Sequence, residues 1–205
     1  MAGIRDDPGA WPVRDSAVLA RGHIVTVRTD AVELPDGEIV SREVVEHPGA
    51  VAILALDDED RVLMIRQYRH PVGATLWEIP AGLRDVAGEP LVETARRELL
   101  EEAGYRASSW HVLADFATSP GITTERLRIF LARNLAVVPP AEREYVPEHE
   151  EAYLTTAWVP LPDAVRGILA GELHNGVAMV GILSAYAASG DGFKALRDAD
   201  EPETL

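Results

Sequence analysis

Residues 90–103 form the segment whose structure the sequence constrains most tightly. Pro90 is favoured at the first position of a helix, where its missing amide donor costs nothing, and Gly104 is favoured just past a helix end. On a wheel of about 100° per residue, one face between them collects the apolar residues Leu91, Val92, Ala95, Leu99 and Ala103. The sequence therefore predicts a helix over 90–103 that packs this face on a sheet.

Three glutamates lie beside this apolar face. Glu98 and Glu102 are one turn apart at its rim, and Glu101 is next to them on the solvent side. Carboxylates this close repel one another, and hard divalent cations such as Mg²⁺ and Mn²⁺ would relieve the repulsion. The simpler interpretation is a solvated face with arginine partners, which is the commoner role of helical glutamates.

The rest of the chain mixes strand-like and helical segments without strict alternation. β-Branched runs within 23–46 flank the turn signal Pro35-Asp36-Gly37 and predict a small antiparallel meander. Further strands are expected at 51–56, 62–69, 76–79, 111–116, 127–135 and 153–159, and further helices at 162–170 and 177–188. This pattern favours an α+β fold, an α/β/α sandwich with a mixed sheet, over a doubly wound parallel sheet.

Three regions are expected along the chain. Residues 1–46 would form an N-terminal arm and meander, residues 47–188 the main domain, and residues 189–205 a peripheral charged tail. Residues 1–16 are polar and punctuated by proline, so they are expected to be weakly ordered. A meander this small cannot bury a core alone.

Charge and composition exclude several classes of protein. With 19 Lys and Arg against 34 Asp and Glu, the formal net charge is −15, so nucleic acid is not expected as a partner. The chain contains no cysteine, which excludes disulfides, thiolate zinc sites and cysteine nucleophiles. No apolar run reaches the roughly 18 to 20 residues of a membrane span. A cytoplasmic protein without membrane association is therefore expected.

The helix and the loop before it contain the string G-x6-E-x7-R-E-L-x-E-E-x-G-Y, which runs from Gly82 through Glu89 to Tyr105. This string closely resembles the signature of the Nudix hydrolases, G-x5-E-x7-R-E-U-x-E-E-x-G-U, where U is aliphatic. Two departures are one extra residue between Gly82 and Glu89, and Tyr105 at the last apolar position. Each fixed position matches by chance only about once in ten to twenty, so a coincidence over the whole string is very improbable.

The resemblance implies a metal site on the predicted helix. Glu98 and Glu102 would be direct ligands of Mg²⁺ or Mn²⁺, and Glu101 a further ligand or a support for the other two. Gly82 would keep the preceding loop close to the helix, so that the carbonyl group of Ala81 could be an additional ligand. Bound cations would also explain how a chain with a net charge of −15 binds a polyanion.

The resemblance also assigns supporting and catalytic roles. Glu89 would support the metal site, and Arg97 would pair with the glutamates and fix their rotamers during catalysis. The implied reaction is hydrolysis of a nucleoside diphosphate linked to another group, in which metal ions polarise the phosphate oxygens and activate a water molecule.

Segments outside the signature resemble the ADP-ribose pyrophosphatase branch of this family. They are residues 41–47, 67–70 and 76–82, together with Pro120, sixteen residues past Gly104. The resemblance implies ADP-ribose, or a similar nucleoside diphosphate sugar, as the substrate and AMP and ribose 5-phosphate as products. The alternatives are a Nudix enzyme for another nucleotide sugar, a dinucleotide or a nucleoside triphosphate, and a non-catalytic ADP-ribose-binding sensor.

Contacts to the substrate follow from the same resemblance. Arg42 and Glu43 would contact the adenosine and ribose side, and Arg69 would donate two hydrogen bonds to a phosphate. Both arginines could instead be ordinary residues on a strand surface. The resemblance further implies a homodimer, in which strands from about residues 20–46 pack against the neighbouring subunit and help to form its substrate pocket.

The general base is expected outside the helix, because carboxylates that hold metal ions have lowered basicity. The acidic stretch before Tyr153 resembles the loop that carries this base in ADP-ribose pyrophosphatases. Glu151 gives the best match, and Glu150 and Glu148 are the alternatives. On composition alone, the same stretch would be a solvated acidic loop.

Overall fold

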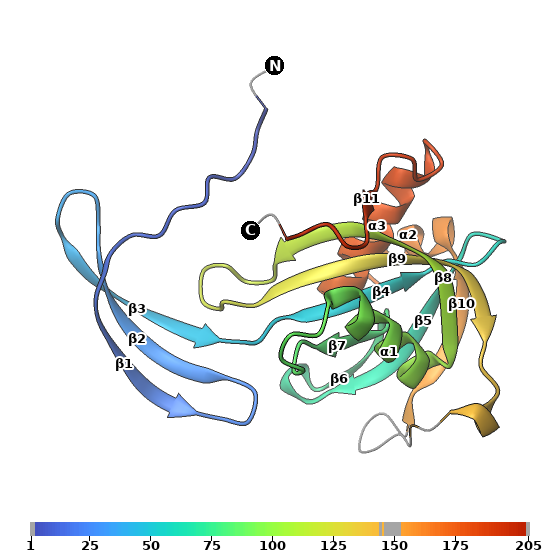
Figure 1. Cartoon of the computed structure of the whole chain (residues 1–205), viewed down its shortest axis with the longest axis horizontal. Helices are drawn as coiled ribbons and strands as arrows, with labels where there is room; N and C mark the ends of the chain where they lie inside the picture. Colours follow the sequence, from blue (N-terminus) through green and yellow to red (C-terminus); the bar gives the residue numbers. More distant parts are fainter. Residues whose placement is uncertain (1–2, 144, 146–152, 204–205) are drawn as a thin grey trace.

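The computed structural model describes residues 3–143, 145 and 153–203, which form an N-terminal sheet and a larger body (Figure 1). The N-terminal sheet is antiparallel and has the order β1-β2-β3, with β1 at Val13–Arg21, β2 at Thr26–Glu33 and β3 at Ile39–Glu46. Gly37 has a φ of 89°, the left-handed conformation that glycine adopts readily in the predicted turn. This sheet contains the predicted meander and stands beside the body (Figure 1).

One strand of this sheet was not predicted. β1 pairs with β2 from Val13 onward, although residues up to 16 were expected to be weakly ordered. The sequence of β1 lacks the alternation of apolar and polar residues by which a half-buried strand is recognised, and all nine of its residues are exposed. Pairing with β2 therefore orders a segment whose own pattern carries no strand signal.

The body contains two sheets. The larger has the order β11-β8-β9-β4-β7, and its elements are β4 (Ala50–Ala55), β7 (Ala81–Leu83), β8 (Tyr105–Ala117), β9 (Arg126–Val137) and β11 (Arg197–Asp198). β4 runs parallel to β9 while the other pairs are antiparallel, so this sheet is mixed. The smaller, antiparallel sheet has the order β10-β5-β6, with β5 at Arg61–Arg69, β6 at Ala74–Glu78 and β10 at Thr155–Pro160.

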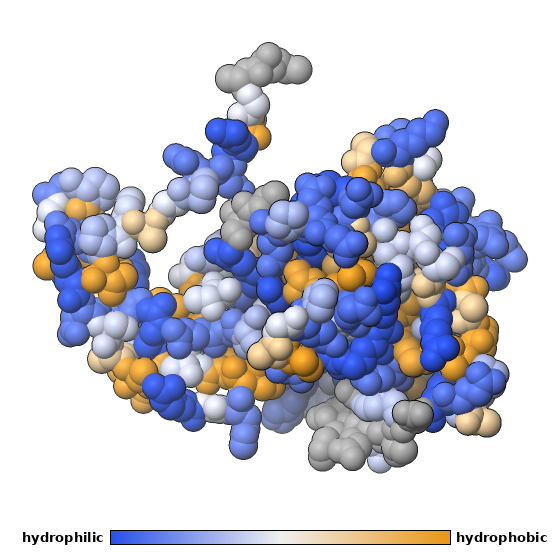
Figure 2. Space-filling view, in the orientation of Figure 1, coloured by the Kyte–Doolittle hydropathy of each residue, from blue (hydrophilic) through white to orange (hydrophobic). Residues whose placement is uncertain are grey.

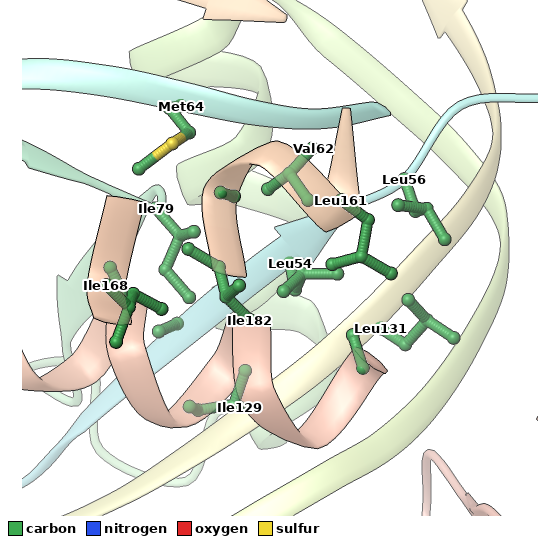
Figure 3. Packing of buried hydrophobic residues seen from close by; sticks show 14 of the residues in the cluster. Leu54, Leu56, Val62, Met64, Ile79, Ile129, Leu131, Leu161, Ile168 and Ile182 are labelled. Atoms are coloured by element: carbon green, nitrogen blue, oxygen red, sulfur yellow. The ribbon is translucent and has the colours of Figure 1, made fainter. Parts of the chain in front are cut away.

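Helices lie on both sides of the larger sheet. They are α1 (Leu91–Ala103), α2 (Leu161–Leu169) and α3 (Gly176–Ser189), and short 3-10 turns occur at His70–Val72 and Pro140–Glu142. Successive residues of β4 face opposite layers. Ile53 packs in the cluster that contains Leu99 of α1, and Leu54 packs in the cluster that contains Ile182 of α3 (Figure 3). The predicted α/β/α sandwich with a mixed sheet is confirmed. Within the described residues, no helix is long and apolar enough to cross a bilayer.

The predicted helix is α1, with one difference at its start. Pro90 occupies the position before the helix rather than the first helical position, and Leu91 begins the helix. Gly104 ends it in the left-handed conformation, with a φ of 72°, and its amide donates to the carbonyl of Leu100. Leu99 is fully buried against the sheet.

The C-terminal tail is more closely attached than predicted. β11 pairs with β8, and Arg197 donates to Asp115 at 2.9 Å. Arg128, which is 2% exposed, donates to both oxygens of Asp115 and to the carbonyl of Glu201. The tail therefore covers a buried ion pair, an interaction between distant residues that no local pattern reports.

This cluster predicts a pH dependence of stability. Burial raises the pKa of Asp115, but hydrogen bonds from Arg128 and Arg197 outweigh burial and hold that pKa below its ordinary value. The stabilisation is therefore present above the unfolded pKa of about 4 and is lost as the pH falls through the folded pKa. We expect Asp115→Asn to lower the Tm by several degrees at pH 7, and the difference from the wild type to shrink below pH 4.

A matched control for this measurement is Asp198→Asn. Asp198 is an exposed carboxylate of β11, in the same part of the tail. The Tm of Asp198→Asn should therefore differ little from that of the wild type at either pH. Thermal unfolding followed by circular dichroism between pH 7 and pH 3 gives the comparison. A Tm difference for Asp115→Asn that is constant over this range would contradict the assignment.

Candidate active site

Strand β7 lies directly against the glutamates of α1. An added Cβ at Gly82 would be 2.0 Å from Cδ of Glu98 and 2.2 Å from its Oε1, so only glycine leaves room for this carboxylate. The backbone amide of Ala81 donates to Oε2 of Glu102 at 2.8 Å. The segment before the helix therefore fixes two of the three signature glutamates from outside the helix.

Arg97 connects the acidic groups of the site. Its guanidinium donates to Glu98 at 2.7 Å and to Glu89 at 3.3 Å, and it lies 3.5 Å from Glu101 and 3.6 Å from Asp85. Burial lowers the pKa of Arg97, but the hydrogen bond to Glu89 and the surrounding carboxylate charges raise it further, so the side chain stays charged. Asp85 was not predicted, because the loop position that it occupies is variable in the signature.

Glu89 is held at the start of the helix despite the extra residue in the preceding loop. The hydroxyl group of Thr94 donates to Oε2 of Glu89 at 2.8 Å, and Thr94 is 1% exposed. Hydrogen bonds from Thr94 and Arg97 lower the pKa of Glu89 against the opposing effect of burial. Sequence reasoning missed Thr94, since the residue lies at a position that the signature leaves open.

The donor atoms of the site fit a hard divalent cation. The carboxylates of Glu98 and Glu102 lie against the backbone of Gly82 and Ala81, and Glu101 lies near Arg97 on the same helix; Mg²⁺ and Mn²⁺ prefer such oxygen ligands. Within the described residues, no three acidic or histidine side chains already surround one point. Here Arg97 pairs with two of the glutamates, and the Ala81 amide pairs with the third.

The contact at Gly82 gives a direct test of the glutamate geometry. Gly82→Ala should displace the end of the Glu98 side chain, because the new methyl group occupies its place. We expect metal affinity and kcat to fall by about ten- to a hundredfold, with little change in Tm, because a flexible side chain can move aside. Metal titration and thermal unfolding of this variant and of Gly121→Ala, where nothing lies within 4 Å of an added Cβ, separate the two effects. Unchanged metal affinity in Gly82→Ala would contradict the assigned contact.

A cavity of about 540 Å³ adjoins the acidic centre. Its wall includes Ala81 and Gly82, next to the glutamates, and also Arg69, His47 and Glu125. Arg69 is held there by Glu78 through hydrogen bonds of 2.7 to 3.2 Å. Arg69 therefore lies in the wall of a cavity that reaches Ala81 and Gly82, the two residues that contact the signature glutamates.

Arg42 and Glu43 lie elsewhere. Both are on β3 of the N-terminal sheet, and neither lines this cavity. As neighbours in a strand they point to opposite faces of the sheet, and Arg42 donates to the carbonyl of Ser41. Within one chain, the structure does not bring these two residues to Arg69. The three candidate bases, Glu148, Glu150 and Glu151, lie outside the described residues.

Two family models match the chain. Residues 46–177 match the model described as NUDIX domain, and residues 11–45 match the nucleoside diphosphate sugar hydrolase N-terminal domain. The chain belongs to the Nudix hydrolase family. Nudix hydrolases generally use divalent metal ions, in keeping with the oxygen donors of the site. The boundary between the two matched models falls at the end of β3.

The chain is similar to two bacterial proteins and to one solved structure. The chain is 48% identical to the ADP-ribose pyrophosphatase of Mycobacterium tuberculosis, over 90% of this chain and 87% of that one. It is 39% identical to the ADP-ribose pyrophosphatase of Bacillus subtilis, over 75% and 80%. The crystal structure of an ADP compounds hydrolase superposes with a TM-score of 0.74 at 22% identity, covering 92% of this chain and 99% of that one, which shows a shared fold.

Proposed function

We propose that this Nudix hydrolase cleaves the diphosphate bond of ADP-ribose to give AMP and ribose 5-phosphate. The observation that carries the proposal is a cavity with Arg69 in its wall that reaches Gly82, against which Glu98 lies. An arginine fork suits a phosphate, and a cluster of carboxylates suits the cations that accompany a diphosphate. The similarity to two ADP-ribose pyrophosphatases over most of their length supports this substrate.

Each residue of the site has a part in the proposed reaction. Glu98, Glu101, Glu102 and the carbonyl of Ala81 would hold Mg²⁺ or Mn²⁺, which when bound supplies positive charge for the diphosphate oxygens and lowers the pKa of water. Arg69 binds and orients the phosphates. The support from Arg97 and Glu89 keeps the glutamate rotamers fixed, so that no reorganisation is needed during the reaction.

The proton of the attacking water goes to a carboxylate outside α1. We assign this role to Glu151, with Glu150 and Glu148 as alternatives, on the sequence resemblance. As the water oxygen bonds to phosphorus, the bridging bond of the diphosphate breaks and the base takes the proton. A base on another segment keeps proton transfer separate from the glutamates that would hold the cation.

We further propose a homodimer formed through the N-terminal sheet. The sheet exposes apolar residues on its strands and loops (Figure 2): Val13, Val18, Leu19, Ile24 and Ile39. Such a surface is typical of an interface. Arg42 and Glu43 lie away from the cavity of their own chain, so they would serve the pocket of the partner subunit.

Light scattering tests the dimer. At micromolar concentration we expect twice the 22.3 kDa of one chain. Exchanging Leu19 and Ile39, both more than half exposed, for Asp should shift the mass toward the monomer and reduce activity, because burial of a charge opposes association. A monomeric wild type with full activity would contradict the proposal.

The substrate is tested by a panel of nucleotides with Mg²⁺. Purified protein is incubated with ADP-ribose, NADH, GDP-mannose or an oxidised dGTP, and the product nucleotides are separated and measured. We expect kcat/KM to be highest for ADP-ribose. Preferred cleavage of another compound would favour a different Nudix substrate, and binding of ADP-ribose without cleavage by the metal-loaded protein would favour a sensor.

A further inference from the structure

Arg69 and Glu78 lie on the same face of the β5–β6 hairpin. The register pairs Arg69 with Ala74, and Glu78 with Ile65. Residues directly opposite share a face and alternate residues along a strand share it too, so both side chains emerge on the side that lines the cavity. Because their registers differ by four residues, Arg69 must extend back along the hairpin to reach Glu78.

The pair is asymmetric in its burial. The side chain of Glu78 is 3% exposed, whereas that of Arg69 is 42% exposed. Nε of Arg69 donates to both oxygens of Glu78, at 2.9 and 3.2 Å, and Nη2 donates to Oε2 at 2.7 Å. A buried carboxylate is stable only when it is paired, and a two-nitrogen contact fixes the plane of the guanidinium as well as its position. Glu78 therefore anchors Arg69 while the arginine stays accessible.

Glu78 is also connected to the glutamate centre through the chain itself. The carbonyl of Pro80 accepts from the amide of Ile53 in β4, at 2.8 Å. The next residues are Ala81, which donates to Glu102, and Gly82, which contacts Glu98. One short segment, 78–82, thus positions the arginine at one end and two signature glutamates at the other.

We propose that Glu78 is a positioning residue for catalysis, which acts by fixing Arg69 at a set distance from the glutamate centre. The inference rests on the proposed function, because it takes a nucleoside diphosphate as the group that Arg69 binds. In a chain with a net charge of −15, an arginine without this anchor would have many other carboxylates to pair with. Glu78 holds it where a phosphate beside the glutamates can reach it.

A double-mutant cycle on ligand binding tests the proposal. Calorimetry with ADP-ribose in the presence of EDTA measures Kd without turnover. We expect Glu78→Gln and Arg69→Ala each to raise Kd by about tenfold, the scale of one charge-assisted hydrogen bond. The double variant should bind as Arg69→Ala does, within about twofold, because Glu78 acts only through Arg69.

Asp163→Asn is the matched control, since Asp163 pairs with Arg166 on the exposed surface of α2. Asp163→Asn alone should have the Kd of the wild type. Asp163→Asn combined with Arg69→Ala should have the Kd of Arg69→Ala. If Glu78→Gln does not fold, Glu78→Asp keeps the charge but shortens the side chain, and the same non-additive rise in Kd is expected. With metal present, kcat/KM should fall in Glu78→Gln and in Arg69→Ala, and the double variant should again match Arg69→Ala.

Two results would overturn the inference: an unchanged Kd in Glu78→Gln, or effects of Glu78→Gln and Arg69→Ala that multiply in the double variant. A purely structural role would lower the Tm and leave the two residues uncoupled in binding. Failure of the proposed function is seen separately, since a wild type that does not hydrolyse ADP-ribose would cleave another nucleotide of the panel or none.

Discussion

Replacing Glu98 by Gln should lower kcat by about a thousandfold or more, because the change removes the charge with which Glu98 would hold the cation and keeps the size of the side chain. The side chain of Glu98 is 12% exposed and contacts Gly82 and Arg97. Glutamine retains an oxygen that can accept from Arg97, so the fold should persist. The same result is expected of Glu102→Gln, whose amide oxygen can still accept from Ala81.

Glu93→Gln is the control for these variants. Glu93 lies on the same helix, and its ion pair with Arg96 is half exposed, so its removal should change kcat little. Steady-state kinetics over a range of metal concentrations, with thermal unfolding of each variant, separate lost metal binding from lost structure. Near-normal turnover of Glu98→Gln at low Mg²⁺ would mean that the site is wrongly assigned.

Replacing Glu151 by Gln should lower kcat by about a hundred- to ten-thousandfold, the usual contribution of a general base. KM and metal affinity should stay near their wild-type values, because the lost interaction belongs to the transition state. Single substitutions of Glu148 and Glu150 by Gln are the comparison, and the largest decrease in kcat identifies the base. Wild-type kcat in all three variants would place the base elsewhere in the chain.

The local signals of the sequence predicted the parts of the fold that depend on local interactions. Pro90 and Gly104 bounded α1 to within one residue, since both act through backbone geometry at the helix ends. The spacing of the signature also brought Gly82 and Glu98 to adjacent positions across β7 and α1. Such features need only a helix and the segment next to it.

Interactions between distant parts of the chain could not be predicted in this way. β1 is ordered by pairing with β2 and carries no alternation of its own. The tail is ordered where Arg197 donates to Asp115, which also pairs with the buried Arg128. Both partners lie more than sixty positions earlier in the chain than Arg197. Within a single chain the N-terminal sheet holds Arg42 away from the cavity that Arg69 lines, so their expected meeting at one substrate pocket requires the partner subunit.

Contacts made by less distinctive residues were missed for a different reason. Thr94 and Asp85 both contact the charged network of the site, and each occupies a position that the signature leaves open. A buried threonine in a helix usually contributes to packing, so the presence of Thr94 in the sequence does not indicate a hydrogen bond to Glu89. Only the folded structure shows that Glu89 is held from two sides.

The most direct test of the proposed reaction is phosphorus NMR of ADP-ribose incubated with the purified protein and Mg²⁺. We predict that the diphosphate signals disappear while AMP and ribose 5-phosphate appear in equal amounts, and that EDTA or Glu98→Gln stops the reaction. Persistent diphosphate signals with the metal-loaded wild type, or cleavage that continues in Glu98→Gln, would contradict the assignment of this centre as an ADP-ribose pyrophosphatase.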